Sequence, residues 1–234
     1  MRLMKYINES IEDKGILKAC FMAGFPGSGK SYVITTITSG QLEPRIINTD
    51  KYVEFLKAYK ASEWNKVEDR VKLLTKNQLV LNLNSMLPLW VDGTSSNPSS
   101  LARRNGILKS IGYDTAMIWV DTSIETSIER AKKRKREVTE KDIRKIYNKL
   151  EGLKTYYSKD FRHFTEILND EGELTEKVIL QAFKKVTSFF NSPIENPIGQ
   201  KLVKKMRSRG EKYLTDGEYT KAFLKKLVST WYTS

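Results

Sequence analysis

The stretch GFPGSGKS at residues 24–31 decides the fold of this chain. It follows the pattern G-x-x-x-x-G-K-S, in which glycines let backbone N–H groups turn toward a bound phosphate. The apolar run LKACFMA at 17–23 precedes it and predicts a buried strand, and the residues after it, to about Ser39, predict a helix. Together they predict a phosphate-binding loop, where the positive end of the helix dipole adds to the attraction.

The loop predicts ATP and Mg²⁺ as ligands. Lys30 is placed to bridge the β- and γ-phosphates, and the hydroxyl of Ser31 is placed to bind Mg²⁺. A glycine turn that binds no nucleotide is the alternative, but the strand before the loop and the helix after it weigh against that interpretation. The residues expected to surround the nucleotide are Gly24, Phe25, Pro26, Gly27, Ser28, Gly29, Lys30 and Ser31.

Apolar runs alternate with helical periodicity along the next part of the chain. This order predicts crossover connections and an α/β fold, a parallel β-sheet P-loop NTPase core flanked by helices. The further expected strands are 44–50, 88–93, 114–121 and 163–168, and the expected helices are 2–13, 51–60, 62–86, 97–113, 123–136, 139–155 and 173–190.

The segment NSPIENP at 191–197 has two prolines and no periodicity, and it predicts a domain boundary. We therefore expect a domain at 1–190 and a small, basic, C-terminal helical extension at 191–234. Residues 198–234 contain nine Lys and Arg against three Asp and Glu. The extension either contacts nucleic acid or packs back on the first domain, and the sequence leaves both possibilities open.

The whole chain of 234 residues carries a formal net charge of +13. This favours a polyanionic partner, nucleic acid above all, although a basic surface that only aids solubility is the simpler alternative. The single cysteine, Cys20, excludes an internal disulfide, and no apolar stretch is long enough for a membrane helix. The start of the chain lacks the apolar core of a signal peptide, so a cytoplasmic protein is expected.

Two carboxylates follow expected strands. Asp50 ends the second strand and Asp92 ends the third. Ligands of open α/β sheets lie beyond the carboxyl ends of the strands, so both side chains are expected to face the same crevice as the loop. Either could instead cap the helix that follows, because Asp is a favourable N-cap residue.

The basic segment RAKKRKR at 130–136 follows the fourth strand. Most of its side chains are expected to be solvated. Phosphoryl transfer nevertheless needs cations over the γ-phosphate, and a basic lid between two helices is a natural source. Arg130 and Arg134 are four residues apart and share one helical face.

Taken together, GFPGSGKS, INTDKY at 47–52, VDGTSSNP at 91–98 and the basic segment resemble the 5′-hydroxyl polynucleotide kinase branch of the P-loop kinases. Zeta-toxin-type kinases share this skeleton. The resemblance covers roughly residues 16–170 and implies a kinase-like core. It assigns the role of general base to Asp50, and it assigns to Arg134 the lid arginine that contacts the γ-phosphate.

Two departures leave the acceptor open. The polynucleotide kinases have an arginine three residues after the base, where this chain has Val53. Asp92-Gly93-Thr94 stands where that branch has Asp-Thr-Asn, and it is closer to the Glu-Gly-Thr of zeta-type kinases.

Three functional hypotheses follow. The first is an ATP-dependent kinase acting on a hydroxyl of a nucleic acid or nucleotide, either a 5′-OH or the hydroxymethyl group of a modified base, as in phage DNA-modifying kinases. In it, Asp50 accepts the proton, while Lys30, Arg130 and Arg134 stabilise the transferring phosphoryl group. Mg²⁺ is held by Ser31 and, through water, by Asp92. The second is a zeta-type small-molecule kinase, and the third is a non-catalytic, nucleotide-dependent nucleic-acid-binding protein.

Overall fold

The computed structural model describes residues 15–38, 45–49, 52, 64–133, 139–170, 176–209 and 219–232. Several expected features lie outside these described residues. They are the helix at 2–13, most of the helix at 51–60, and the residues Asp50, Val53 and Arg134.

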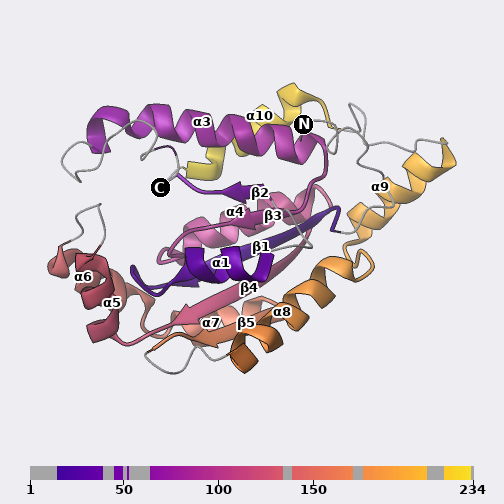
Figure 1. The fold of residues 1–234 in the computed structure, drawn as a ribbon. Helices are drawn as coiled ribbons and strands as arrows, with labels where there is room; N and C mark the ends of the chain where they lie inside the picture. Colours follow the sequence, from indigo (N-terminus) through magenta and orange to yellow (C-terminus); the bar gives the residue numbers. More distant parts are fainter. Residues whose placement is uncertain are drawn as a thin grey trace, which may run out of the picture.

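In the described part of the chain, five parallel strands form one sheet in the order β2-β3-β1-β4-β5 (Figure 1). At least one helix precedes each strand after β1, as expected of the crossover connections in a parallel sheet. The predicted α/β fold of P-loop type is therefore confirmed. The strands are β1 (Lys18–Gly24), β2 (Arg45–Ile47), β3 (Leu89–Val91), β4 (Asp114–Asp121) and β5 (His163–Leu168).

The two faces of the sheet have separate apolar cores, because successive strand residues point to opposite sides. Cys20 and Met22 of β1 pack into a cluster with α1 (Lys30–Thr38) and α8 (Glu176–Asn191). Ala19 and Phe21 pack into a larger cluster on the other face. This second layer includes α3 (Trp64–Asn84), α4 (Pro98–Ser110) and α7 (Leu153–Asp160).

The helices after β4 differ from the expectation in one respect. The prediction of a single helix over 139–155 is wrong. The structure has α6 (Glu140–Leu150) and then α7 (Leu153–Asp160), separated by Gly152 at φ +77°. A left-handed residue interrupts a helix, and glycine adopts that conformation at low cost. The remaining helix of this region, α5 (Ile124–Lys132), begins at the N-cap Ser123.

The C-terminal residues form α9 (Pro197–Ser208), α10 (Lys221–Val228) and the 3₁₀ helix η3 (Ser229–Tyr232). They pack back on the core around the sheet, one of the two alternatives that the sequence left open. In Figure 1, α10 lies along α3. The side chains that they bury in the larger core include Leu202, Met206, Leu224, Val228 and Trp231.

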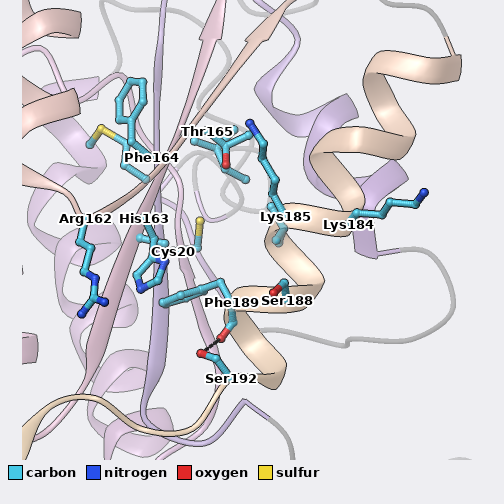
Figure 2. Close-up of a pocket in the computed structure, with 14 residues that line it drawn as sticks. Cys20, Arg162, His163, Phe164, Thr165, Lys184, Lys185, Ser188, Phe189 and Ser192 are labelled. Atoms are coloured by element: carbon cyan, nitrogen blue, oxygen red, sulfur yellow. Dashed lines mark hydrogen bonds between the residues drawn. The ribbon is translucent and has the colours of Figure 1, made fainter.

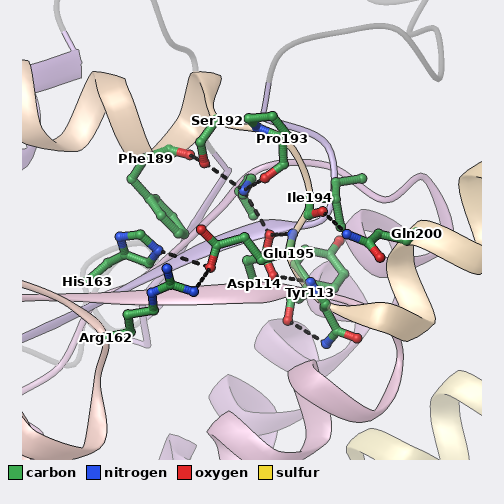
Figure 3. A network of polar contacts seen from close by, with 12 residues as sticks. Tyr113, Asp114, Arg162, His163, Phe189, Ser192, Pro193, Ile194, Glu195 and Gln200 are labelled. Atoms are coloured by element: carbon green, nitrogen blue, oxygen red, sulfur yellow. Dashed lines mark hydrogen bonds and ion pairs between the residues drawn. The ribbon is translucent and has the colours of Figure 1, made fainter.

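A buried ion pair fixes the segment that leads into α9. Lys18, only 1% exposed, places its Nζ 2.8 Å from Oδ2 of Asp114 and 2.9 Å from the carbonyl oxygen of Pro193. Asp114 also accepts hydrogen bonds from the backbone N–H groups of Glu195 and Asn196, at 2.8 and 2.7 Å (Figure 3). The proline-rich segment is therefore tied to the amino-terminal ends of β1 and β4.

Candidate nucleotide-binding and phosphotransfer site

The loop between β1 and α1 has the backbone of a phosphate cradle. Gly24, Gly27 and Gly29 have φ values of +139°, +86° and +87°, and the loop is closed by a hydrogen bond from the N–H of Ser28 to the carbonyl of Phe25 at 3.1 Å. Helix α1 begins at Lys30, so the N–H groups of its first turn lack acceptors within the helix. These N–H groups lie at the positive end of the helix dipole, which favours a bound anion such as phosphate.

Lys30 lies inside this loop. Its Nζ donates hydrogen bonds to the carbonyl oxygens of Gly24 and Phe25, at 2.9 and 2.8 Å. Ser31, the next residue, is exposed in the first turn of α1. Lys30 and Ser31 are thus consecutive residues in the first turn of α1, directly after the loop. Their roles with phosphate and Mg²⁺ stay predictions.

The wall of the loop is supplied by a residue that the sequence analysis missed. Asn169, which follows β5 and is 6% exposed, donates from Nδ2 to the carbonyl oxygen of Ser28 at 2.6 Å. A Cβ on Gly29 would lie 2.2 Å from this same Nδ2. From helix α5, Ser127 donates from Oγ to the carbonyl oxygen of Pro26. The loop is therefore held from two directions.

Asp92 lies at the carboxyl end of β3, as predicted. Its carboxylate Oδ2 accepts a hydrogen bond from Nδ2 of Asn48 at 2.6 Å, and its N–H donates to the carbonyl of Ile47 at 3.0 Å. These contacts join the ends of β2 and β3 beside the loop. Asp50, two residues after Asn48, lies outside the described residues, so its role as a base stays a prediction.

The segment after Asp92 is braced against β1. Ser95, at φ +55°, donates from Oγ to the carbonyl oxygen of Met22 at 2.8 Å, and the hydroxyl of the buried Tyr157 donates to the carbonyl of Ser95 at 2.7 Å. The carbonyl of Thr94 accepts a bond from the N–H of Gly24 at 3.3 Å. Burial raises the pKa of Tyr157, so its hydroxyl remains a donor.

Helix α5 is joined to the residues after β5. Arg130 of α5 donates from Nη1 to the carbonyl oxygen of Asn169 at 2.7 Å. Asp170 accepts from Oγ1 of Thr122 at 2.7 Å and from the N–H of Ser123 at 2.8 Å. Partial burial acts to raise the pKa of Asp170, but these hydrogen bonds outweigh it and lower the pKa. Arg134 lies outside the described residues.

Aromatic side chains connect the loop with helix α6. The ring of Phe25 stacks on Tyr147 of α6, with 4.2 Å between centroids and an angle of 16°. Its edge meets Trp119 of β4 at 6.4 Å. Burial, followed by the nearby carboxylates of Asp121 and Glu125, raises the pKa of Tyr147. A residue of the loop therefore contacts α6 directly.

A separate cavity of about 440 Å³ lies away from this site, under the last turns of α8 and beside the start of β5 (Figure 2). His163, Phe189 and Cys20 are among its lining residues. Cys20 is buried, as expected, and burial raises its pKa. His163 lies 3.5 Å from the carboxylate of Glu195, a structural contact. Because the loop is at the opposite ends of the strands, this cavity is not the nucleotide site.

The donor set suits Mg²⁺ carried by phosphate oxygens. Among the described residues, no three His, Cys, Asp or Glu side chains gather closely enough to hold a metal ion. Mg²⁺ usually takes only one or two protein ligands and completes its shell with waters and substrate phosphates. The Ser31 hydroxyl and the Asp92 carboxylate are two such oxygen donors at the carboxyl edge of the sheet.

Three of these contacts escaped sequence reasoning because they depend on tertiary structure. Ser127 and Ser95 carry no spacing signal. Asn169 does carry one, since it directly follows an expected strand, at the sheet edge where ligands bind.

Among the described helices, none is long and apolar enough to cross a membrane.

Comparisons with known proteins agree with this geometry. A family model described as an AAA domain matches residues 20–153, more than half of the chain. A search of curated proteins finds no significant match.

Two solved structures share the fold. A chain of the Pnkp1/Rnl/Hen1 RNA repair complex has a TM-score of 0.51 and 19% identity, over 64% of this chain and 48% of that one. A protein from Chloroflexus aurantiacus, assigned by inference as a kinase, has a TM-score of 0.54 and 12% identity, over 74% of this chain and 97% of that one. The chain therefore belongs to the AAA domain family.

Proposed function

We propose that this protein is an ATP-dependent kinase that transfers the γ-phosphate to a hydroxyl of a nucleic acid or nucleotide. The observation that carries the proposal is the meeting of three elements at one edge of the sheet. The loop with Lys30 and Ser31 ends β1, the Asn48–Asp92 pair joins the ends of β2 and β3, and the lid residue Arg130 lies against the residues after β5.

Nucleotide binding falls to the loop. Its backbone N–H groups and Lys30 hold the β- and γ-phosphates, and Ser31 binds Mg²⁺ with Asp92 acting through water. Mg²⁺ supplies charge neutralisation for the transferring group. Asn169 keeps the loop in shape through its bond to Ser28. Arg130 uses one donor of its guanidinium on the carbonyl of Asn169, and the guanidinium has five.

Acceptor activation falls to Asp50, which takes the proton of the attacking hydroxyl. We assign it to the acceptor side of the loop because, in the sequence, it follows Asn48 by two residues and β2 by three. Arg134, four residues after Arg130, provides a second cation for the charge that spreads over the γ-phosphoryl oxygens in the transition state.

The polymeric acceptor is supported by charge. A net charge of +13 exceeds what ATP requires, and the helices after residue 196 are strongly basic. The fold likeness to a chain of an RNA repair complex agrees with this choice of acceptor. A 5′-hydroxyl of DNA or RNA, or the hydroxymethyl group of a modified base in phage-type DNA, fits the same chemistry.

A second candidate is a zeta-type kinase for a small acceptor such as a nucleotide sugar. Asp92-Gly93-Thr94 favours it, as does Val53 in place of the arginine of the polynucleotide kinases. The excess positive charge of the surface counts against it.

Transfer of label from γ-labelled ATP to a panel of acceptors tests the proposal. The panel contains 5′-hydroxyl DNA and RNA, base-hydroxymethylated DNA, nucleosides and nucleotide sugars. We expect label on a nucleic acid, with an affinity for the polymer that falls steeply as salt rises. Label only on a small acceptor, with little salt dependence, supports the zeta-type kinase. Tight ATP binding without transfer to any acceptor contradicts both and supports a non-catalytic binder.

A further inference from the structure

The phosphate-binding loop contacts two helices through consecutive residues. The ring of Phe25 stacks on Tyr147 of α6, and the carbonyl oxygen of Pro26 accepts a hydrogen bond from Oγ of Ser127 in α5. A Cβ on Gly27 would lie only 2.5 Å from the carbonyl oxygen of Ser127, so α5 approaches the loop as closely as a glycine allows. The first part of the loop is therefore in contact with both helices.

Helices α5 and α6 pack on each other and lie side by side (Figure 1). Ile128 and Ala131 of α5 and Ile143 of α6 form a small apolar cluster in which all three side chains are buried. Tyr147 follows Ile143 by four residues, and positions four apart share one face of a helix. The face of α6 that packs on α5 therefore also carries the ring that contacts the loop.

The ring of Phe25 has little freedom to move. It is 5% exposed and stacks on Tyr147, with 4.2 Å between the ring centroids and an angle of 16°. It also meets Trp119 of β4 edge to face, at 6.4 Å and 86°. Stacked and edge-to-face arrangements are the favourable geometries of aromatic pairs. Because both partners belong to elements outside the loop, β4 and α6 together set the position of Phe25.

The backbone of Phe25 contacts the lysine of the loop. Its carbonyl oxygen accepts a hydrogen bond from Nζ of Lys30 at 2.8 Å and another from the N–H of Ser28 at 3.1 Å. The carbonyl oxygen of Gly24 accepts from the same Nζ at 2.9 Å. Phe25 therefore joins α6 to the Lys30 ammonium, through its ring on one side and its carbonyl oxygen on the other.

This connection matters because a lysine side chain is flexible. Its ammonium is carried on a four-carbon stem and has three donors. In Lys30, carbonyl oxygens of Gly24 and Phe25 fix the direction of two hydrogen bonds. A side chain that is ordered before its ligand arrives loses less conformational entropy on binding. A displaced Phe25 carbonyl would therefore weaken the attraction of Lys30 for phosphate.

We propose that Tyr147 is a positioning residue for Lys30, and that it acts by holding Phe25 and, through it, the carbonyl oxygen that orients the lysine ammonium. The inference deepens the proposed function and rests on it for the role of Lys30 at the β- and γ-phosphates. It makes ATP affinity depend on the contact between α6 and the loop, through a residue that lies far from the G-x-x-x-x-G-K-S pattern in sequence.

A purely structural ring pair is the competing explanation, since Phe25 belongs to the larger apolar core. That explanation predicts that removal of the Tyr147 ring lowers stability and has no effect on ATP that depends on Lys30. The proposal predicts an effect on ATP affinity that requires the Lys30 ammonium. Changes at independent sites have additive effects, so a double-variant cycle distinguishes the two explanations.

Isothermal titration with ATP and Mg²⁺ tests the proposal on the wild type, Tyr147→Ala, Lys30→Ala and the double variant. We expect Tyr147→Ala to weaken ATP affinity roughly 2- to 12-fold, which corresponds to the usual strength of an aromatic pair. The same change made in the Lys30→Ala protein should have little effect. Tyr147→Phe should restore the wild-type affinity, because stacking requires the ring and not the hydroxyl.

The matched control is Phe223→Ala, which removes one ring of another stacked pair. Phe223 and Tyr219 have 5.5 Å between ring centroids and an angle of 19°, and Phe223 belongs to α10, which packs on α3. This change should leave ATP affinity unchanged. Thermal unfolding shows whether each variant is folded. If Tyr147→Ala is unfolded, Tyr147→Leu replaces it, because leucine keeps an apolar side chain without a flat ring.

The outcomes separate this inference from the proposed function. A loss of ATP affinity that is equal with and without Lys30, or no loss in either protein, overturns the inference. Phosphoryl transfer to an acceptor, with an ATP affinity that does not depend on Tyr147, overturns the inference and leaves the function. Non-additive effects on ATP binding, without transfer to any acceptor, support the inference and contradict the function. A wild-type protein that binds no ATP contradicts both.

Discussion

Nδ2 of Asn169 donates to the carbonyl oxygen of Ser28 at 2.6 Å, and this bond couples the end of β5 to the centre of the phosphate-binding loop. The carbonyl of Asn169 in turn accepts a hydrogen bond from Arg130 of α5. One buried residue therefore contacts both the loop that binds phosphate and a cation expected to act on it. The shape of the loop and the position of Arg130 therefore both depend on Asn169.

The first prediction concerns Gly29. Changing Gly29→Ala should weaken ATP binding by at least tenfold and destabilise the protein by about 1–3 kcal/mol. The reasons are the φ of +87° and the 2.2 Å approach of the new Cβ to Nδ2 of Asn169. Isothermal titration with ATP and Mg²⁺, together with chemical denaturation, measures both effects.

A matched control is Gly106→Ala in α4, where the added Cβ meets nothing within 4 Å. This change should be neutral or stabilise the protein by about 0.4–1 kcal/mol. Adding Asn169→Ala to Gly29→Ala should recover part of the lost stability by removing the clash. No recovery would mean that backbone strain alone accounts for the defect.

The second prediction concerns the buried pair of Lys18 and Asp114. Lys18→Met should reduce the free energy of unfolding by about 3–5 kcal/mol, because it leaves a buried carboxylate without its cation. The comparison is Lys154→Met, since Lys154 is 41% exposed and binds Asp121 and Glu166 in a solvated pair. That change should cost about 0–1 kcal/mol. Equal effects of the two changes in urea denaturation would contradict the assignment.

The third prediction concerns the pH dependence of stability. The hydrogen bonds from Thr122 and Ser123 lower the pKa of Asp170 below its ordinary value of 3.8. A depressed pKa adds stability above the ordinary value, and this stability is lost as the pH falls through the lower, folded-state value. Asp170→Asn should therefore destabilise the protein at pH 7 and much less at pH values below the folded pKa. A pH-independent difference in thermal unfolding would exclude this ionised role.

The fourth prediction contrasts Asp50 with Lys30. Asp50→Asn keeps the side-chain shape and removes the proton acceptor, so turnover should fall by roughly 10²–10⁴ with ATP affinity nearly unchanged. Lys30→Ala should weaken both ATP binding and turnover, because its charge acts in the ground state and in the transition state. If Asp50→Asn retains near-normal transfer, Asp92 becomes the leading candidate for the base. If it abolishes ATP binding, Asp50 belongs to the metal site.

Much of the core could be predicted from sequence because its signals are local. GFPGSGKS fixes a strand, a loop and a helix at once, and apolar runs mark each following strand. The break at Gly152 was missed because the apolar periodicity of α6 runs into that of α7 without a proline. A glycine within a helical pattern indicates a break only weakly.

The contacts around the loop were not predictable in the same way. The bond from Asn169 to Ser28 joins residues 141 positions apart, and no spacing rule connects them. The anchoring of the extension through Lys18 is a similar case, because a lysine in a buried strand gives no indication of its partner. Such contacts follow from the register of β1 against β4, which only the folded chain establishes.

The most direct test of the central claim is the ratio of ADP formed to phosphate transferred. Wild-type protein is incubated with γ-labelled ATP, Mg²⁺ and a 5′-hydroxyl or base-hydroxymethylated oligonucleotide, and ADP and acceptor-bound label are counted in the same sample. If the protein is a nucleic-acid kinase, we expect one labelled phosphate on the oligonucleotide for each ADP released. ADP released without label on the oligonucleotide, or no ADP at all, would contradict the claim.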